Sequence, residues 1–185
     1  MRFCIMAEGV NPIMVEVDGI RFTSASRYYD GDTPKMAHLL KENNRMAIEQ
    51  VAAKLSNLLP PFSVIVPIPN RCGYARETLE LARALSRYSG APVADVLKGN
   101  ERESLYDVKK TGRMLTEHDL GFRQVRNLPF YRKPVLLDNV AGTGLTAKAA
   151  YHALGNRGEV LTYAIDDSVL ERAKPIEQAS HGIRR

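Results

Sequence analysis

Strand-forming and helix-forming segments alternate along most of the sequence, and their order limits the folds open to the chain. The run SVIVPI at 63–68 is apolar on both faces, which is typical of a strand buried in a parallel sheet. A helical pattern follows over 77–89 and ends at Gly90. Further strands are predicted at 92–97, 134–138 and 159–165, with a helix over 143–154 between the last two. This order predicts an α/β fold with a mostly parallel central sheet flanked by helices.

The N-terminal part has a different pattern. Residues 13–17 and 20–23 alternate in β style around Asp18-Gly19, a dipeptide that supplies the positive φ angles of a tight hairpin turn. We therefore expect a small β-hairpin as an appendage within residues 1–30. Thr33-Pro34 then opens a helical pattern that runs to Pro60, with a predicted break near Asn43-Asn44.

Size and composition indicate a single globular domain over 1–185. The 185 residues are 44% hydrophobic and 25% charged, and no apolar run approaches the roughly 20 residues that cross a bilayer. The start lacks the pattern of a secretory signal, so a cytoplasmic location without membrane contact is expected. The formal net charge is +5, but Lys and Arg mix with acidic residues, so direct nucleic-acid binding is not expected. Cys4 and Cys72 have neither metal-ligand nor disulfide spacing.

The segment VLLDNVAGTGLT at 135–146 contains the densest chemical signal. A strand that ends at Asp138, a short turn and a helix start at Thr143 would present free backbone amides, with the helix dipole behind them, to a phosphate. Glycines let the backbone approach the ligand closely, and the threonines add hydroxyl donors. A carboxylate and an amide at the end of the strand can bind the vicinal hydroxyls of a sugar. The segment therefore suits a ribose 5-phosphate.

This segment resembles the 5-phosphoribosyl-1-pyrophosphate (PRPP) motif of type I phosphoribosyltransferases. Asp138, Val140 and the small-Thr-Gly-variable-Thr pattern of 142–146 fit that motif, whereas Asn139 stands where the family usually has a second acid. Residues 65–85 are similar to the strand, pyrophosphate loop and helix of the ComF-like and amidophosphoribosyltransferase-like branch. The polar stretch 98–132 would be a flexible hood or insertion.

The resemblance implies a role for each matching residue. Catalytic contacts to the ribose fall to Asp138 and Asn139. The 5-phosphate would be wrapped by Ala141, Gly142, Thr143, Gly144, Leu145 and Thr146. The pyrophosphate would lie by Pro69, Asn70, Arg71 and Arg76, with the hood contributing Arg102, Lys109 and Lys110. Mg²⁺ would be held through PRPP and water rather than by a protein cage, with Asp138 as the nearest candidate ligand.

The implied activity is transfer of ribose 5-phosphate from PRPP to an unidentified nitrogen acceptor, with release of pyrophosphate. A homodimer is left open. A second hypothesis is a non-catalytic protein that binds PRPP or a nucleotide, either as a regulator or in ComF-like DNA uptake; Asn139 and the lack of an obvious general base favour it.

Two other interpretations of the loop stay open. Gly142-x-Gly144-x-x-Ala147 with Asp166 also satisfies a dinucleotide fingerprint, and the glycines could merely permit tight packing.

Overall fold

The central feature of the fold is a six-stranded, mostly parallel sheet. The computed structural model describes residues 11–103, 108, 110 and 112–176. The sheet has the order β3-β6-β7-β2-β1-β8. Its strands are β1 (Ile13–Val17), β2 (Ile20–Arg27), β3 (Ser63–Pro67), β6 (Lys133–Ala141), β7 (Glu159–Ile165) and β8 (Lys174–Pro175). The α/β class and the mostly parallel sheet predicted from the sequence are confirmed.

The pairing register explains how the N-terminal hairpin joins the sheet. β3, β6, β7 and β2 are mutually parallel neighbours, whereas β1 is antiparallel to both β2 and β8. Asp18 and Gly19 have φ angles of 53° and 77° and form the predicted turn. Because β2 pairs with β7 along its length, the hairpin extends the central sheet instead of standing apart from it.

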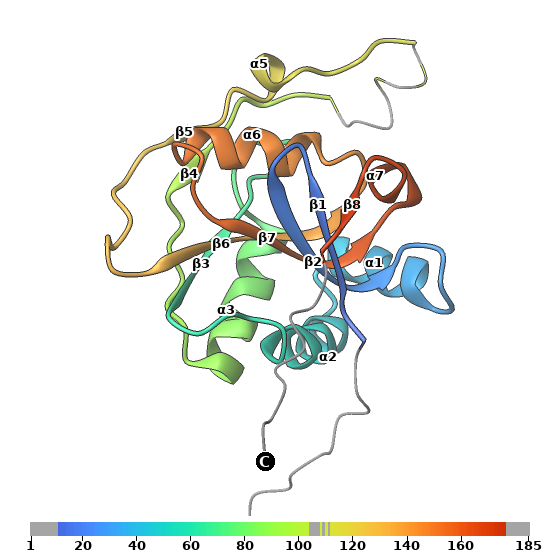
Figure 1. The fold of residues 1–185 in the computed structure, drawn as a ribbon, viewed down its shortest axis with the longest axis vertical. Helices are drawn as coiled ribbons and strands as arrows, with labels where there is room; N and C mark the ends of the chain where they lie inside the picture. The colour runs from blue at the N-terminus through green and yellow to red at the C-terminus, as the bar shows by residue number, and fades with distance from the viewer. Residues whose placement is uncertain (1–10, 104–107, 109, 111, 177–185) are drawn as a thin grey trace, which may run out of the picture.

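Helices cover both faces of the sheet, as Figure 1 shows. One face packs against α1 (Thr33–Lys41), α2 (Arg45–Ser56) and α3 (Glu77–Ser89), and the other against α6 (Leu145–Ala153). Side chains alternate along β6. Val135 and Leu137 therefore pack on the face covered by α1, α2 and α3, and Leu136 packs on the face covered by α6. β6 is therefore buried on both faces and fixes the position of the loop that follows it.

The break predicted near Asn43-Asn44 is confirmed. Asn43 has φ of 55°, which ends α1, and the Asn44 side chain accepts a hydrogen bond of 3.1 Å from the amide of Ala47 as the N-cap of α2. We expect Asn44→Ala to lower the free energy of unfolding by about 1 kcal/mol, because that amide loses its acceptor. Urea denaturation measures this effect. Asn44→Asp keeps an acceptor and serves as the control; equal losses in both variants would contradict the capping role.

Two sequence predictions need correction. The strand predicted at 92–97 is wrong: Val93 forms an isolated bridge to Ile65, and the chain then leaves the sheet. Only Leu97 is in a strand, as part of β4 (Leu97–Lys98). Pro92 has no N–H for a ladder, so an edge contact here stays short. The helix predicted from Thr143 begins at Leu145, because Gly144 has φ of 78° and cannot belong to a right-handed helix.

The described part of the segment 98–132 folds back over α6. β4 pairs with β5 (Arg123–Gln124), and α5 (Glu117–Leu120) lies beyond α6 in Figure 1. A capping box between Thr116 and Asp119 starts α5.

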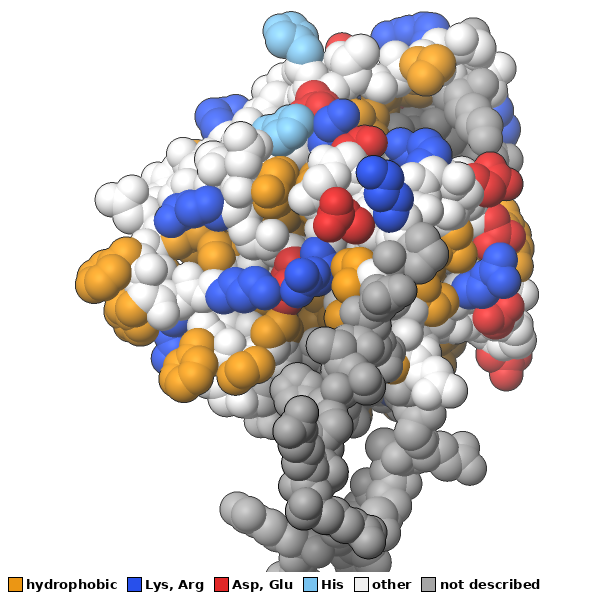
Figure 2. Space-filling model, viewed as in Figure 1, with side chains coloured by type: hydrophobic (Ala, Val, Ile, Leu, Met, Phe, Trp, Pro, Cys, Tyr) orange, Lys and Arg blue, Asp and Glu red, His pale blue; other side chains and the backbone are white. Residues whose placement is uncertain are grey.

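Within the described residues, no helix has both the length and the apolar character of a membrane span. On the face drawn in Figure 2, basic side chains are interspersed with acidic and apolar ones.

Candidate functional site

A pocket of about 360 Å³ opens at the carboxyl ends of β3 and β6. This is the edge of a parallel sheet at which ligands of α/β proteins bind, and the volume is in the range of small-molecule sites. Most of its walls come from three segments, the chain from the end of β3 to the start of α3, the end of β6 and the start of α6, and Lys41 of α1 and Arg102 complete the lining. Its lining residues are Lys41, Ile68, Pro69, Asn70, Arg71, Glu77, Thr78, Arg102, Asp138, Asn139, Val140, Ala141, Gly142, Thr143, Gly144, Thr146 and Ala147.

Asp138 is the carboxylate at the end of β6 that lines this pocket. Its side chain is half-buried, and burial raises its pKa from 3.8 to about 6. Hydrogen bonds from the amides of Asn139 and Val140 and the charges of Lys41 and Arg102 oppose this increase only in part. The free protein thus holds a carboxylate in surroundings that do not fully stabilise its charge, a property common at functional sites.

Asn139 occupies a more enclosed position than the sequence suggested. β6 continues to Ala141, so Asp138 and Asn139 belong to the strand rather than to a turn after it. Asn139 is 7% exposed, and its Oδ1 atom is buried without a hydrogen-bond partner. A buried acceptor without a donor is unfavourable, so this atom suits a ligand that supplies an O–H or N–H group.

The loop 141–146, here called the phosphate loop, presents unoccupied donors. The amide of Leu145 donates to Oγ1 of Thr143 at 3.3 Å, but the amides of Thr143, Gly144 and Thr146 have no acceptor among the described residues. Gly142 and Thr143 are exposed, so a ligand can reach this backbone. Free amides at the start of α6, with its dipole behind them, favour an anion.

Three cationic residues from distant segments line the same pocket. Lys41 ends α1, Arg71 follows β3, and Arg102 comes from the segment after β4. Arg102 Nη1 donates to the carbonyl of Asn70 at 3.0 Å, whereas its Nε is buried without a partner. Burial lowers the pKa of Arg102, and the charge of Asp138 opposes that effect. The Glu77 carboxylate also lines the pocket, where it accepts a hydrogen bond from the Asn70 side chain.

Most of the residues proposed from the sequence meet in this pocket, but some do not. Arg76 is exposed and precedes α3 outside the pocket lining, and Leu145 lines the neighbouring pocket instead. Lys110 is exposed and is not in the lining, and Lys109 lies outside the described residues. Asp166 caps α7 (Asp167–Leu170) by accepting from the amide of Ser168 at 2.9 Å, away from the lining. The lining residues that were not predicted as site residues are the polar Lys41, Glu77 and Thr78 and the apolar Ile68, Val140 and Ala147.

Gly73 joins the loop after β3 to the segment that carries Arg102. Its φ is 77°, and an added Cβ would lie 2.4 Å from the carbonyl oxygen of Gly99. We expect Gly73→Ala to lower the free energy of unfolding by at least about 2 kcal/mol more than Gly90→Ala does, because both introduce left-handed strain and only Gly73 adds a steric clash. Gly90, with φ of 72° and no atom within 4 Å, is the matched control. Equal losses in urea denaturation would contradict this packing.

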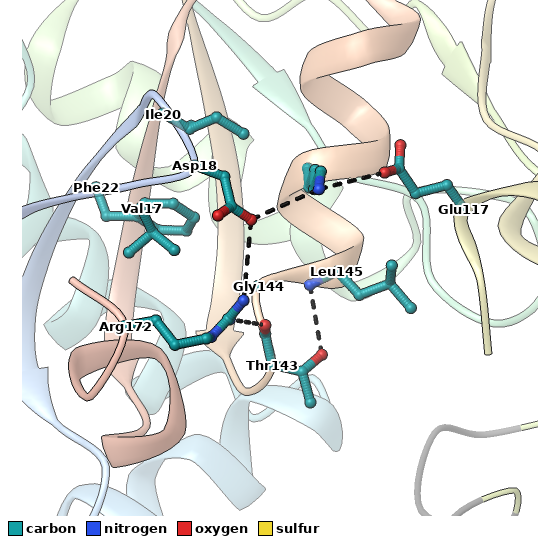
Figure 3. A pocket seen from close by; sticks show the side chains of 10 residues that line it. Val17, Asp18, Ile20, Phe22, Glu117, Thr143, Gly144, Leu145 and Arg172 are labelled. Atoms are coloured by element: carbon teal, nitrogen blue, oxygen red, sulfur yellow. Dashed lines mark hydrogen bonds and ion pairs between the residues drawn. The ribbon is translucent and has the colours of Figure 1, made fainter. Parts of the chain in front are cut away.

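A second, smaller pocket of about 150 Å³ lies on the other side of the phosphate loop (Figure 3). Its charged lining residues are already paired with one another. Asp18 lies 3.5 Å from Lys148 and 3.9 Å from Arg172, and Lys148 lies 3.9 Å from Glu117. Because these charges offset each other, the larger pocket is the better candidate for an anionic ligand.

The pocket has few groups that could hold a metal directly. No cluster of three or more His, Cys, Asp or Glu side chains occurs within the described residues. Mg²⁺ keeps most of its waters and prefers phosphate oxygens together with one or two carboxylates. Asp138 fits that limited role.

Comparisons with known proteins leave the family open. No protein-family model matches the chain, and no curated protein matches it in sequence. Among solved structures, the chain is similar to one described as the allosteric regulatory enzyme of purine biosynthesis. The identity is 15% and the TM-score 0.42, over 64% of this chain and 25% of that one. A likeness this weak does not establish a shared function.

Proposed function

We propose that the pocket binds PRPP and that the protein transfers ribose 5-phosphate from it to a nitrogen acceptor. One observation carries this proposal: the free amides of the phosphate loop, the Asp138 carboxylate and three cationic side chains line a single pocket. PRPP offers a group for each of them. Its 5-phosphate suits the loop amides, its ribose hydroxyls suit Asp138 and the buried Oδ1 of Asn139, and its pyrophosphate suits Arg71 and Arg102.

The proposed reaction is a displacement at C1 of the ribose. The bond from C1 to the pyrophosphate oxygen breaks, and its electron pair leaves with the pyrophosphate. The lone pair of the acceptor nitrogen forms the new C1–N bond, and the acceptor loses a proton to solvent. Arg71 and Arg102 would stabilise charge on the leaving group, while Asp138 would stabilise positive charge on the ribose. Mg²⁺ bound with the substrate would add to the stabilisation of the pyrophosphate charge.

A pair of arginine variants tests this assignment. Arg71 lines the pocket and Arg76, five residues on, does not. We expect Arg71→Met to raise the dissociation constant for PRPP with Mg²⁺ at least about 10-fold, the equivalent of one lost charge-assisted contact of about 1.4 kcal/mol. Arg76→Met should change it less than about 2-fold. Titration calorimetry measures both; absence of PRPP binding by the unsubstituted protein would overturn the proposal.

A non-catalytic PRPP-binding or nucleotide-binding module is the second candidate. Asn139 favours it, because a neutral amide stabilises a cationic ribosyl group less than a second carboxylate would. Phosphorus NMR with a panel of bases and amines separates the two candidates. Release of pyrophosphate that depends on the acceptor supports the enzyme, and PRPP binding without any release supports the module.

A further inference from the structure

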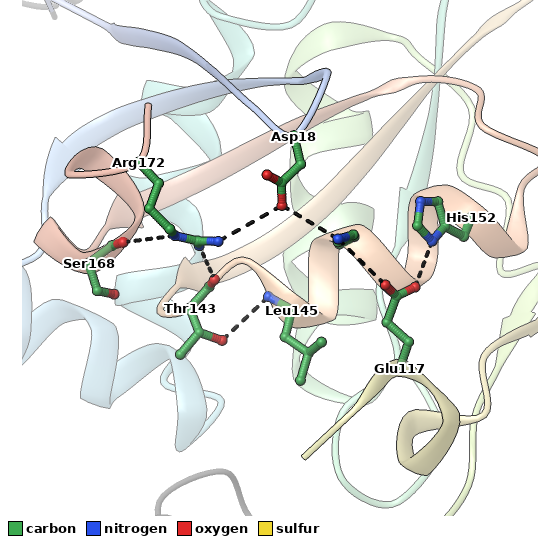
Figure 4. Close-up of polar contacts among 8 residues, drawn as sticks. Asp18, Glu117, Thr143, Leu145, His152, Ser168 and Arg172 are labelled. Atoms are coloured by element: carbon green, nitrogen blue, oxygen red, sulfur yellow. Dashed lines mark hydrogen bonds and ion pairs between the residues drawn. The ribbon is translucent and has the colours of Figure 1, made fainter. Parts of the chain in front are cut away.

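Two carbonyl groups of the phosphate loop accept hydrogen bonds from Ser168 in α7 and from Arg172 just after it. Ser168 Oγ donates to the carbonyl of Gly142 at 2.7 Å, and Arg172 Nη2 donates to the carbonyl of Thr143 at 2.5 Å. Both contacts join the loop to residues that lie 26 and 29 positions further along the chain. Figure 4 shows Arg172 reaching Thr143 from the side on which Asp18 lies.

These contacts determine where the neighbouring amides point. In a planar trans peptide, the carbonyl of one residue and the N–H of the next point in opposite directions. Holding the carbonyl of Gly142 toward Ser168 therefore turns the N–H of Thr143 the other way. Holding the carbonyl of Thr143 toward Arg172 does the same for the N–H of Gly144. These are two of the amides without an acceptor, and both residues line the larger pocket.

The two donors are themselves fixed in place. Arg172 Nε donates to the carbonyl of Ser168 at 3.2 Å, and Arg172 Nη1 lies 3.9 Å from the Asp18 carboxylate. The Ser168 amide donates to Asp166, the N-cap of α7. The side chains of Arg172 and Asp18 are 48% and 47% exposed, so their ion pair contributes little to stability. Positioning of the loop accounts better for this arrangement than stabilisation of the fold does.

We infer that Ser168 and Arg172 are positioning residues that preset the anion-binding amides of the phosphate loop. Neither residue lines the larger pocket, so each acts through the loop backbone rather than on the ligand. The inference rests on the proposed function, because it assumes that the 5-phosphate binds these amides. Without Arg172 or Ser168, a peptide of the loop can rotate and present its carbonyl oxygen to the phosphate.

The test measures binding of ribose 5-phosphate and of PRPP with Mg²⁺ by Arg172→Ala, Arg172→Lys, Ser168→Ala and Ser168→Thr. We expect Arg172→Ala and Ser168→Ala to weaken binding of both ligands at least about 10-fold with little change in Tm. Ser168→Thr keeps the hydroxyl and should retain the binding of the unsubstituted protein. Millimolar guanidinium should restore part of the binding of Arg172→Ala, and Arg172→Lys should fall between Arg172→Ala and the unsubstituted protein.

The matched control is Arg157→Ala. Arg157 is also an exposed arginine that donates to a backbone carbonyl, that of Leu154 at 3.3 Å, but at the other end of α6. It should leave binding unchanged and show no guanidinium rescue. Amide NMR should show shifts of Thr143 and Gly144 in Arg172→Ala and not in Arg157→Ala. Tight binding by Arg172→Ala and Ser168→Ala would overturn the inference alone, whereas no binding by the unsubstituted protein would overturn it together with the proposed function.

Discussion

Asp138→Asn should make the ligand-free protein more stable at pH 8 and at the same time weaken its binding of PRPP. The substitution removes a charge that burial disfavours, and the amide Oδ1 can still accept from the amides of Asn139 and Val140. A pKa raised from 3.8 to about 6 means that the folded protein retains a proton that the unfolded chain has released. Stability therefore falls as pH rises from about 4 to about 6 and stays lower above that range, by roughly 2–3 kcal/mol.

Urea denaturation between pH 4 and pH 8 tests both parts of this prediction. Asp138→Asn should flatten the pH dependence over that window and raise the free energy of unfolding at pH 8. Asp30→Asn, at an exposed position, should alter stability by less than about 0.5 kcal/mol. Binding of PRPP by Asp138→Asn should weaken at least about 10-fold, since the ribose hydroxyls lose a charged acceptor. A lower free energy of unfolding at pH 8 would instead make Asp138 a structural residue.

The fold could be predicted from local patterns where those patterns are strong. The helix 77–89 was predicted with the bounds that α3 has, because its apolar spacing is regular and Gly90 takes the left-handed conformation that ends it. The strand 159–165 coincides with β7 for a similar reason, since it is buried along its whole length. The pairing of β2 with β7 could not be predicted, because it joins segments more than 130 residues apart and leaves no local signal.

The candidate site was predictable where its residues carry a signal in the sequence, as in the loop 141–146 with Asp138 and in the loop 69–71 with Arg102. The phosphate loop and Asp138 share one motif, so a resemblance could indicate them together. Lys41 and Glu77 line the pocket because α1 and α3 pack on one face of the sheet, which depends on tertiary structure. The burial of Asn139 depends on how far β6 continues, and strand ends are the least certain part of a sequence prediction. Ser168 and Arg172 carried no motif at all.

Gly144→Ala should weaken binding of ribose 5-phosphate at least about 100-fold, whereas Gly155→Ala should leave it intact. Gly144 and Gly155 flank α6 at opposite ends, with φ angles of 78° and 69°. An alanine at either position suffers left-handed strain of about 1–2 kcal/mol, so both variants should lose similar stability. At Gly144 the strain is relieved by rotation of the peptides that carry the anion-binding amides. An added Cβ there would also lie 3.4 Å from Arg172 Nη2, so rotation would disturb the contact to Thr143.

The comparison of these two glycines separates backbone strain from function. Calorimetry with ribose 5-phosphate gives the binding, and urea denaturation gives the free energy of unfolding of each variant. No atom lies within 4 Å of an added Cβ at Gly155, so Gly155→Ala reports strain alone. A loss of at least about 100-fold in affinity for Gly144→Ala, near 2.7 kcal/mol, corresponds to displacement of two charge-assisted amide contacts. Equal affinity in both variants would mean that the anion binds elsewhere than on the phosphate loop.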